Sequence, residues 1–288
     1  MAVTRSPGLW RLIVACATIA FTLSVTAPGA EEAPDAVARR SIAQLGSARA
    51  DDRADARARL LALGSAVVPL LIEATASDDA TVRWEAVNLL GLLDDPRGID
   101  AVFGMATTDP DVHARWRANW ALARLDDGTV AARLVAVLAG DAPTLSWNAA
   151  VALSLFGGLE AVPTLHRGLD AAGWQQWEAV NALGRIWNDE TPARLAALLR
   201  DASEDVRQEA ALSLGWIGGP IALAALLDAV RDDPSYEVRW RAVMMIGRIG
   251  DAGSAAALAA ARATETDPIV LDELDRAIER LGGVCSSE

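Results

Sequence analysis

The sequence predicts an all-α protein, a right-handed α-solenoid of about eight helical hairpins, each about 31 residues long. Three observations support this fold class. A Val-Arg-Trp-Glu-Ala motif at Val82–Ala86 returns at nearly constant spacing along the chain. The apolar residues within each copy follow the spacing of one helical face. No segment shows the strict apolar and polar alternation typical of a half-buried strand.

The repeat is clearest at the position of Trp84. This position recurs at Trp116, Trp147, Trp177, Gln208 and Trp240, so that successive copies lie one helical hairpin apart. Degenerate copies centred on Ala54 and Asp272 complete the series of eight. A single hairpin of this length cannot bury its own apolar face, so successive copies are predicted to stack on one another.

Each copy is predicted to contain two helices. In the first helix, Val82, Ala86 and Leu90 share one face, and Asp94-Asp95-Pro96 ends it. A second apolar-periodic stretch follows each such turn, at 67–76, 98–106, 130–138, 159–169, 192–199, 221–230 and 255–263. An aspartate in the turn between hairpins is expected to cap the first amide groups of the next helix.

The ends of the chain differ from the repeats. Residues 1–30 hold Arg5, Arg11 and an apolar run at 12–27, which is shorter than the roughly 20 residues of a membrane span, so we expect a signal peptide. An uncleaved anchor and a lipidated Cys16 are the alternatives. We expect an exported protein, periplasmic or secreted, with an N-terminal cap at 31–50, the solenoid at 51–283 and a tail at 284–288.

The motif also resembles a known family. A Val-Arg-x-x-Ala segment, then Leu-Gly, then Gly-Asp or Asp-Asp before a second helix is similar to the HEAT-like repeats associated with phycobilisome lyases, and to designed alpha-repeat proteins. The resemblance covers roughly residues 50–283. It implies a binding scaffold in which an arginine of each unit pairs with an acidic turn residue of the next. The arginines in that position are Arg83, Arg115, Arg207 and Arg239.

Composition excludes several functions. The net charge is −13, which argues against nucleic acid, and all 26 basic residues are Arg, which removes lysine chemistry. The two histidines, His113 and His166, lie far apart and neither precedes a Glu. The His-Glu pairs of deoxyhypusine hydroxylase are therefore missing, and no metal site, cofactor or catalytic cluster is predicted. We expect a protein that is not an enzyme, with bilin-lyase-like activity as a weaker alternative.

The tryptophans give the candidate binding site. On a helix, Trp84 lies about 200° from Val82 and therefore points away from its own core. In designed alpha-repeat proteins, this position lines the inner face. We expect Trp84, Trp116, Trp120, Trp147, Trp177 and Trp240 to bind a protein or extended peptide, with Glu85, Arg117, Glu178, Glu209 and Arg241 at the rim. Two alternatives remain: the indoles fill gaps between units, or they stack on the sugar rings of a glycan.

Overall fold

A computed structural model describes residues 33–282, which form one unit beginning at Pro34. The expected signal peptide at 1–30, the alternative lipidation site at Cys16 and the tail at 284–288 lie outside these residues. None of the helices in the described unit combines the length and the hydropathy that crossing a membrane requires.

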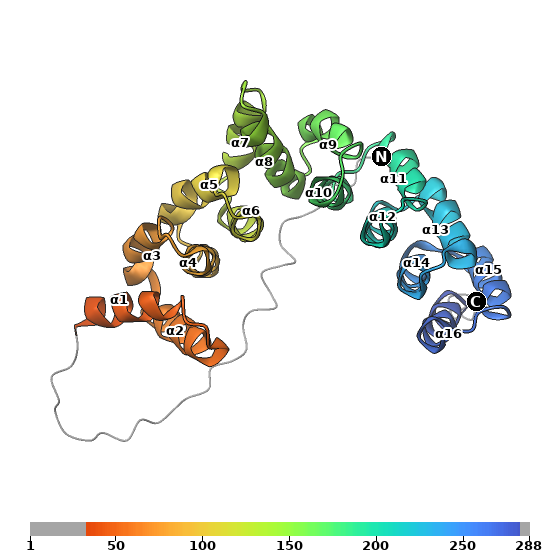
Figure 1. The fold of residues 1–288 in the computed structure, drawn as a ribbon, viewed down its shortest axis with the longest axis horizontal. Coiled ribbons are helices and arrows are strands. Elements are labelled where there is room, and N and C mark those ends of the chain that lie inside the picture. The colour runs from red at the N-terminus through yellow and green to blue at the C-terminus, as the bar shows by residue number, and fades with distance from the viewer. Residues whose placement is uncertain (1–32, 283–288) are drawn as a thin grey trace, which may run out of the picture. The chain divides into compact units, whose positions relative to one another are not determined.

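Sixteen α-helices make up the described unit, which confirms the all-α class and the arrangement of about eight hairpins. Figure 1 shows them in two layers. The inner layer holds α2 (Ala50–Ala62), α4 (Ala80–Leu93), α6 (Val112–Leu125), α8 (Pro143–Leu153), α10 (Trp174–Leu183), α12 (Glu204–Ile217), α14 (Tyr236–Ile249) and α16 (Pro268–Gly282). The outer layer holds α1 (Pro34–Gln44), α3 (Val68–Ala74), α5 (Ile99–Thr108), α7 (Val130–Leu138), α9 (Val162–Gly168), α11 (Thr191–Leu198), α13 (Pro220–Asp232) and α15 (Ala252–Arg262).

Helix α4 shows why the repeat sequence folds into these helices. The Asp79 carboxylate caps the N-terminus and accepts a hydrogen bond from the Thr81 amide at 2.7 Å. Val82, Ala86 and Leu90 are buried on one face. At the other end, Asp94 adopts a left-handed conformation (φ 52°), which stops the helix before the turn.

Small residues allow the inner helices to pack closely. A Cβ atom on Gly91 of α4 would lie 2.9 Å from the Cβ of Ala121 on α6, and one on Gly215 of α12 would lie 2.3 Å from the sulfur of Met245 on α14. These contacts leave no space for a larger side chain. Glycine seven residues after the Trp position therefore sets the distance between neighbouring units.

A ladder of ion pairs links the units, as the family resemblance implied. Arg83 donates to both carboxylate oxygens of Asp109, at 2.8 and 3.0 Å. The same pairing joins Arg207 to Asp233 at 2.9 Å and Arg239 to Glu265 at 2.7 Å. Arg115 donates to the Asp109 carbonyl at 2.8 Å, but forms no ion pair with any described residue. The expectation is thus confirmed for three of the four arginines.

Two of the turn aspartates have a role other than the helix caps expected from the sequence. Asp109 and Asp233 hold the ladder arginines and also accept hydrogen bonds from amides of their own turns, at Asp111 and Ser235. The N-cap of the next helix is the later residue, Asp111 for α6 and Ser235 for α14. One carboxylate therefore shapes the turn and pairs with the neighbouring unit.

The central units depart from this regular pattern. Helices α4, α6, α12 and α14 have 14 residues each, whereas α8 has 11 and α10 has 10. Ser146 and Gln176 occupy the position of the ladder arginine. Helix α8 is attached to the outer layer, because the Asn148 amide donates to the Thr107 carbonyl at the end of α5 at 2.7 Å. Figure 1 shows α8 running obliquely between α6 and α10.

Candidate functional site

The predicted tryptophans lie on the inner helices, but they are not equally exposed. The side chains of Trp84, Trp116, Trp147, Trp177 and Trp240 are half-buried. Trp84 and Trp240 pack against the core, whereas Trp120 is 45% exposed. The six indoles therefore do not form one uniform exposed stripe.

Trp147 fills a gap between units. A Cβ atom on Gly168 of α9 would lie only 2.4 Å from the Cη2 atom of the Trp147 indole. The indole Nε1 donates to the Glu178 carboxylate of α10 at 2.7 Å. This tryptophan joins α8, α9 and α10, so the packing alternative describes it better than the binding alternative.

The acidic residues differ from the rim expected from the sequence. Glu85 is 0% exposed and Glu178 is 8% exposed, because this helical position faces the neighbouring unit. Glu85 forms an ion pair with Arg57 at 3.0 Å, and its second carboxylate oxygen has no hydrogen-bond partner. Burial raises the pKa of Glu85, Glu178 and Glu209, so these groups take up a proton more readily than exposed carboxylates.

Arginines lie over several of the indoles. The Arg117 guanidinium is 5.3 Å from the ring centroid of Trp84 and 5.7 Å from that of Trp116. Arg241 lies 5.6 Å from the ring centroid of Trp240, within its own helix α14. Such contacts are favourable because the guanidinium faces the negative face of the ring. Arg117 and Arg241 thus contribute positive charge to the inner layer.

Helices α6 and α10 meet on the inner side although α8 separates them in the sequence. His113 of α6 lies 6.2 Å from Trp174 of α10, between ring centroids. Near the other ends of the helices, the Arg185 guanidinium lies 5.7 Å from the Trp120 ring. Trp116 packs against Trp120 with 6.2 Å between ring centroids, and Trp177 packs against Trp174. We call these six residues the junction cluster: His113, Trp116, Trp120, Trp174, Trp177 and Arg185.

The junction cluster includes three residues that the sequence analysis did not select. Trp174, 47% exposed, stacks on Trp177 with 4.6 Å between centroids and 24° between ring planes. His113 and Trp174 each stand three residues before a repeat tryptophan, so helical spacing alone places them on the same face. That spacing could have identified both residues. The proximity of Arg185 to Trp120 depends on the oblique path of α8 and has no such signal.

A hollow lies on each side of the junction cluster. A cavity of about 250 Å³ between α4 and α6 is lined by Trp116, Arg117 and Trp120. A second cavity of about 390 Å³ lies between α10 and α12, where Trp174 and Trp177 face Asp205, Gln208, Glu209 and Arg241. Between the two hollows, Trp116, Trp120, Trp174 and Trp177 form what we call the aromatic ridge. This ridge offers apolar area together with hydrogen-bonding groups.

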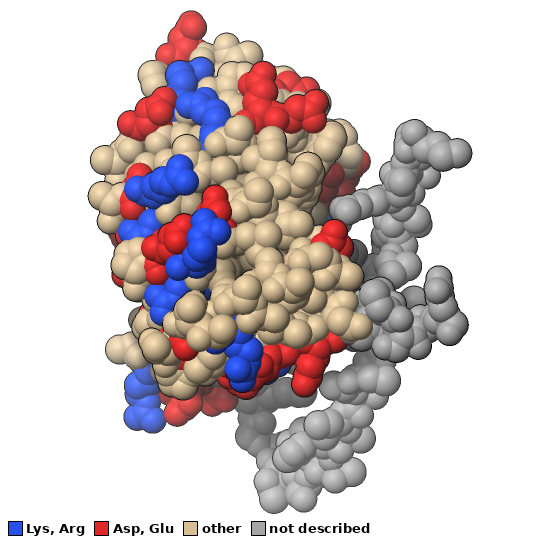
Figure 2. Space-filling model, turned by 90° about the vertical axis from the view of Figure 1, so that its right-hand side faces the viewer, with Lys and Arg blue, Asp and Glu red and all other residues tan. Residues whose placement is uncertain are grey.

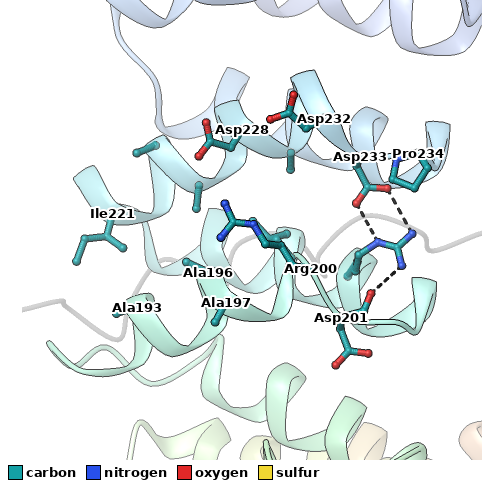
Figure 3. Close-up of a pocket in the computed structure, with 15 residues that line it drawn as sticks. Ala193, Ala196, Ala197, Arg200, Asp201, Ile221, Asp228, Asp232, Asp233 and Pro234 are labelled. Atoms are coloured by element: carbon teal, nitrogen blue, oxygen red, sulfur yellow. Dashed lines mark hydrogen bonds and ion pairs between the residues drawn. The ribbon is translucent and has the colours of Figure 1, made fainter.

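A separate cavity of about 830 Å³ lies in the outer layer between α11 and α13. Figure 3 shows Ala193, Ala196 and Ala197 along α11, with Arg200 projecting between the helices and Asp228 and Asp232 across from it. The ion pair of Arg207 and Asp233 lies at one end. Asp228 and Asp232 both form ion pairs with Arg231. These acids of the cavity therefore already have a partner within the outer layer.

The face drawn in Figure 2 carries charges of both signs, and the histidines of the described residues belong to no metal site. Figure 2 shows Arg beside Asp and Glu in a band along one edge of the visible face, next to uncharged surface. Among residues 33–282, no group of three or more His, Cys, Asp or Glu is arranged to hold a metal ion. His166 is buried and lies 3.0 Å from the Thr191 hydroxyl, far along the chain from His113.

Comparison with known proteins agrees with this architecture. The family model described as HEAT repeats matches residues 67–154, 170–244 and 191–279. The chain therefore belongs to the HEAT repeat family, and it is a HEAT repeat scaffold. No curated protein matches its sequence.

Several solved structures are similar to the chain. The X-ray structure of YibA from Escherichia coli has 18% identity and a TM-score of 0.51, covering 90% of this chain and 99% of that one. The complex of CpcE and CpcF of phycocyanin lyase from Nostoc sp. PCC7120 has 19% identity and a TM-score of 0.46, covering 74% and 94%. An engineered protein has 22% identity and a TM-score of 0.44, covering 85% and 74%. At 18% identity, the similarity to YibA supports the fold alone.

Proposed function

We propose that this protein is a non-enzymatic scaffold that holds an extended polypeptide against the inner layer, centred on the junction cluster. The observation that carries the proposal is the exposure of Trp120 and Trp174 on facing helices. Large aromatic side chains that remain exposed beside hollows are typical of protein-binding surfaces. HEAT arrays also present an extended surface, which suits a partner without a compact shape.

The tryptophans divide into two groups under this proposal. Trp116, Trp120, Trp174 and Trp177 form the contact surface, because they line the two hollows. Trp147 supports the surface by fixing α8 against α10, and it contacts the Glu178 carboxylate rather than the partner. Trp84 and Trp240 lie further along the inner layer and extend the surface only for a longer polypeptide.

Glycan binding is the second candidate function, and the hollow between α10 and α12 favours it. There, the indoles of Trp174 and Trp177 lie beside the polar groups of Asp205, Gln208 and Arg241. Sugar rings can stack on an indole while their hydroxyl groups form hydrogen bonds with such side chains. This site is confined to one hollow, whereas an extended polypeptide uses the ridge and both hollows.

We also propose that the protein is exported, on the basis of the charged start and apolar run within residues 1–30. The test is mass spectrometry of the protein from a bacterial expression host, separated into cytoplasm, membrane and exported fractions. A mature chain that begins near Glu31 in the exported fraction would support export. An intact chain in the cytoplasm would contradict it, and an intact or lipidated chain in the membrane would favour an anchor.

The binding proposal is tested with a double variant, Trp120→Ala with Trp174→Ala. Binding is measured by calorimetry against extended peptides and neutral oligosaccharides. We expect peptide affinity to fall by about 30-fold or more, because two exposed aromatic anchors are lost. Trp187→Ala is the matched control, since Trp187 is 71% exposed but lies outside the junction cluster. Equal peptide binding by the double variant would contradict the proposal, and binding of oligosaccharides alone would favour the glycan candidate.

A further inference from the structure

Arg185 is a partly buried arginine without a carboxylate partner. Its guanidinium donates to the Asn181 carbonyl of its own helix at 3.0 Å and lies over the Trp120 ring. No carboxylate in the described part of the chain forms an ion pair with it. Guanidinium groups are always charged in proteins, so this position holds a positive charge with little local compensation.

The equivalent arginines of other units are used differently. Arg124 and Arg248, like Arg185, stand eight residues after the Trp position. Each of these two donates to a backbone carbonyl of the preceding inner helix, Arg124 to Gly91 at 3.0 Å and Arg248 to Gly215 at 2.8 Å. In the unit before Arg185, Ser154 stands in place of that glycine, at the end of the displaced helix α8. The Ser154 carbonyl accepts a hydrogen bond from the Gly157 amide at 3.3 Å, and among the described residues Arg185 has no such inter-unit bond and lies over Trp120 of α6.

Glu209 is the carboxylate whose charge acts on Arg185, but it already has another hydrogen-bond partner. Glu209 accepts a hydrogen bond from the Asn181 amide at 2.6 Å, and its charge favours that of Arg185 without forming an ion pair. Burial lowers the pKa of Arg185, which indicates that its charge has lost hydration. A ligand carboxylate would offset that loss through a charge-assisted hydrogen bond.

The hollow beside Trp120 has the same sign, since the charged residues that line it, Arg117 and Arg124, are both arginines. Arg117 is exposed, contacts indoles rather than carboxylates, and forms no ion pair with another described residue. Glu85 and Glu178 are buried, whereas the exposed Asp205 and the buried Glu209 line the hollow beside Trp174. Although the chain carries a net charge of −13, the charge that lines the hollow beside Trp120 is therefore positive. Complementarity of charge selects an acidic partner here.

We propose that the Arg185 guanidinium binds a carboxylate of the partner, and that the partner is an extended acidic polypeptide whose apolar or aromatic residues pack on Trp120 and Trp174. This inference rests on the proposed function and adds the chemistry of the partner. A planar guanidinium can bind both oxygens of one carboxylate, which fixes the position of the peptide along the ridge. The neighbouring hollows then receive the side chains that flank the acidic residue.

The test uses three short synthetic peptides of equal length, capped at both ends, in which Leu and Tyr alternate with Glu, Gln or Lys. Affinities are measured by calorimetry at low and at high salt. We expect the Glu peptide to bind the wild-type protein at least about tenfold more tightly than the Gln peptide, since a hydrogen bond to a charged group contributes about 1.5 to 3 kcal/mol. The Lys peptide should bind most weakly.

Variants assign the preference to Arg185. Arg185→Gln should bind the Glu and Gln peptides equally, and Arg185→Lys should keep part of the preference because it retains the charge without the planar fork. Arg248→Gln is the matched control: it changes the same repeat position, whose arginine donates to Gly215, and it should keep the full preference. Circular dichroism verifies that each variant is folded.

The outcomes separate this inference from the proposed function. Equal binding of the Glu and Gln peptides to the wild type would overturn the inference and leave the scaffold proposal intact, provided that Trp120→Ala with Trp174→Ala weakens both. This comparison needs only the wild type, so it stands even if Arg185→Gln does not fold. Failure of all three peptides to bind would overturn both proposals. Binding of an acidic oligosaccharide in place of the Glu peptide would overturn the polypeptide as partner.

Discussion

The last four helices and the four central helices of the solenoid follow the same repeat but are held together differently. In α13–α16, the ladder arginine Arg239 pairs with Glu265 of the next unit, and Asp233 pairs with Arg207 of the preceding α12. Across α7–α10, Ser146 and Gln176 replace the arginines, α8 is short, and the inner contact is formed between α6 and α10. The regular part shows what the repeat needs for stacking, and the irregular part contains the exposed aromatic side chains on which the proposed function rests.

The two regions of the chain use their polar side chains differently. A ladder arginine pairs with an acid and bonds to backbone carbonyls, so it has little capacity left for a partner. In the centre, hydrogen bonds to Thr107 and Glu178 replace ion pairs and tilt α8. Arg185, which lacks the inter-unit backbone bond of Arg124 and Arg248, lies in this irregular part of the chain.

The largest expected effect tests the ladder. Arg207→Ala should lower the free energy of unfolding of α12–α14 by about 3 to 5 kcal/mol, because it leaves a buried carboxylate without its partner. The side chains of Arg207 and Asp233 are only 12% and 3% exposed. Amide hydrogen exchange is the suitable measurement, since repeat arrays open locally.

Gln176→Ala is the matched change in the centre. Gln176 occupies the same repeat position but donates a single 3.0 Å hydrogen bond to Asp201 and a longer one to the Leu169 carbonyl. The expected loss is about 1 kcal/mol, as for a typical hydrogen bond. If both changes cost the same, the ladder would not distinguish the two regions.

Trp147→Ala tests how the central units are held together without the ladder arginines. The change removes the indole between Gly168 and Glu178, so the free energy of unfolding should fall by about 3 kcal/mol, at the lower end for tryptophan because the side chain is half-buried. Hydrogen exchange should increase in α8 and α10 and stay unchanged in α14. Trp147→Phe removes the hydrogen bond to Glu178 and part of the contact with Gly168, and should therefore cost less than Trp147→Ala.

The regular part of the molecule could be predicted from the sequence almost completely. Val82, Ala86 and Leu90 mark the buried face, and Asp94-Asp95-Pro96 marks the end of α4, because helix periodicity and capping are local properties. The family resemblance implied that Arg83 and Arg239 pair with an acidic turn residue of the neighbouring unit, but it did not single out Glu265 as the partner of Arg239. The sequence of one repeat predicts the structure of the others wherever each unit contacts its neighbours in the same way.

The binding surface could be predicted only in part. The repeat position of Trp84 identified the inner helices, but whether an indole is exposed depends on the next unit, which covers Trp147 and leaves Trp120 accessible. Glu85 and Glu178 were expected at a rim because they are charged, yet their helical position faces the neighbouring helix. The approach of α6 to α10 depends on the path of α8, which no local pattern encodes.

The smallest expected effect is a difference in pH dependence between two acids. A hydrogen bond from Arg239 lowers the pKa of Glu265 to about 2, so the folded state binds this proton less readily than the unfolded state does. Its contribution to stability is complete above the ordinary value near pH 4.5 and is lost as the pH falls toward 2. Glu265→Gln should therefore destabilise α14 and α15 at pH 7, and the loss should shrink progressively below pH 4.5.

Glu209 should show the opposite sign, because burial raises its pKa and the folded state binds its proton more readily. Protonation of Glu209 stabilises the fold below pH 4.5, and this contribution is lost as the pH rises through the raised value. Glu209→Gln keeps an oxygen that can accept from Asn181 and removes the buried charge, so it should stabilise α10 and α12 at pH 7 and have less effect near pH 4. Hydrogen exchange at pH 4, 5.5 and 7 compares the two variants. If both variants were less stable than the wild type at pH 7, the buried acids of the centre would be stabilised by pairing, as in the ladder. The two regions would then not differ in their electrostatics.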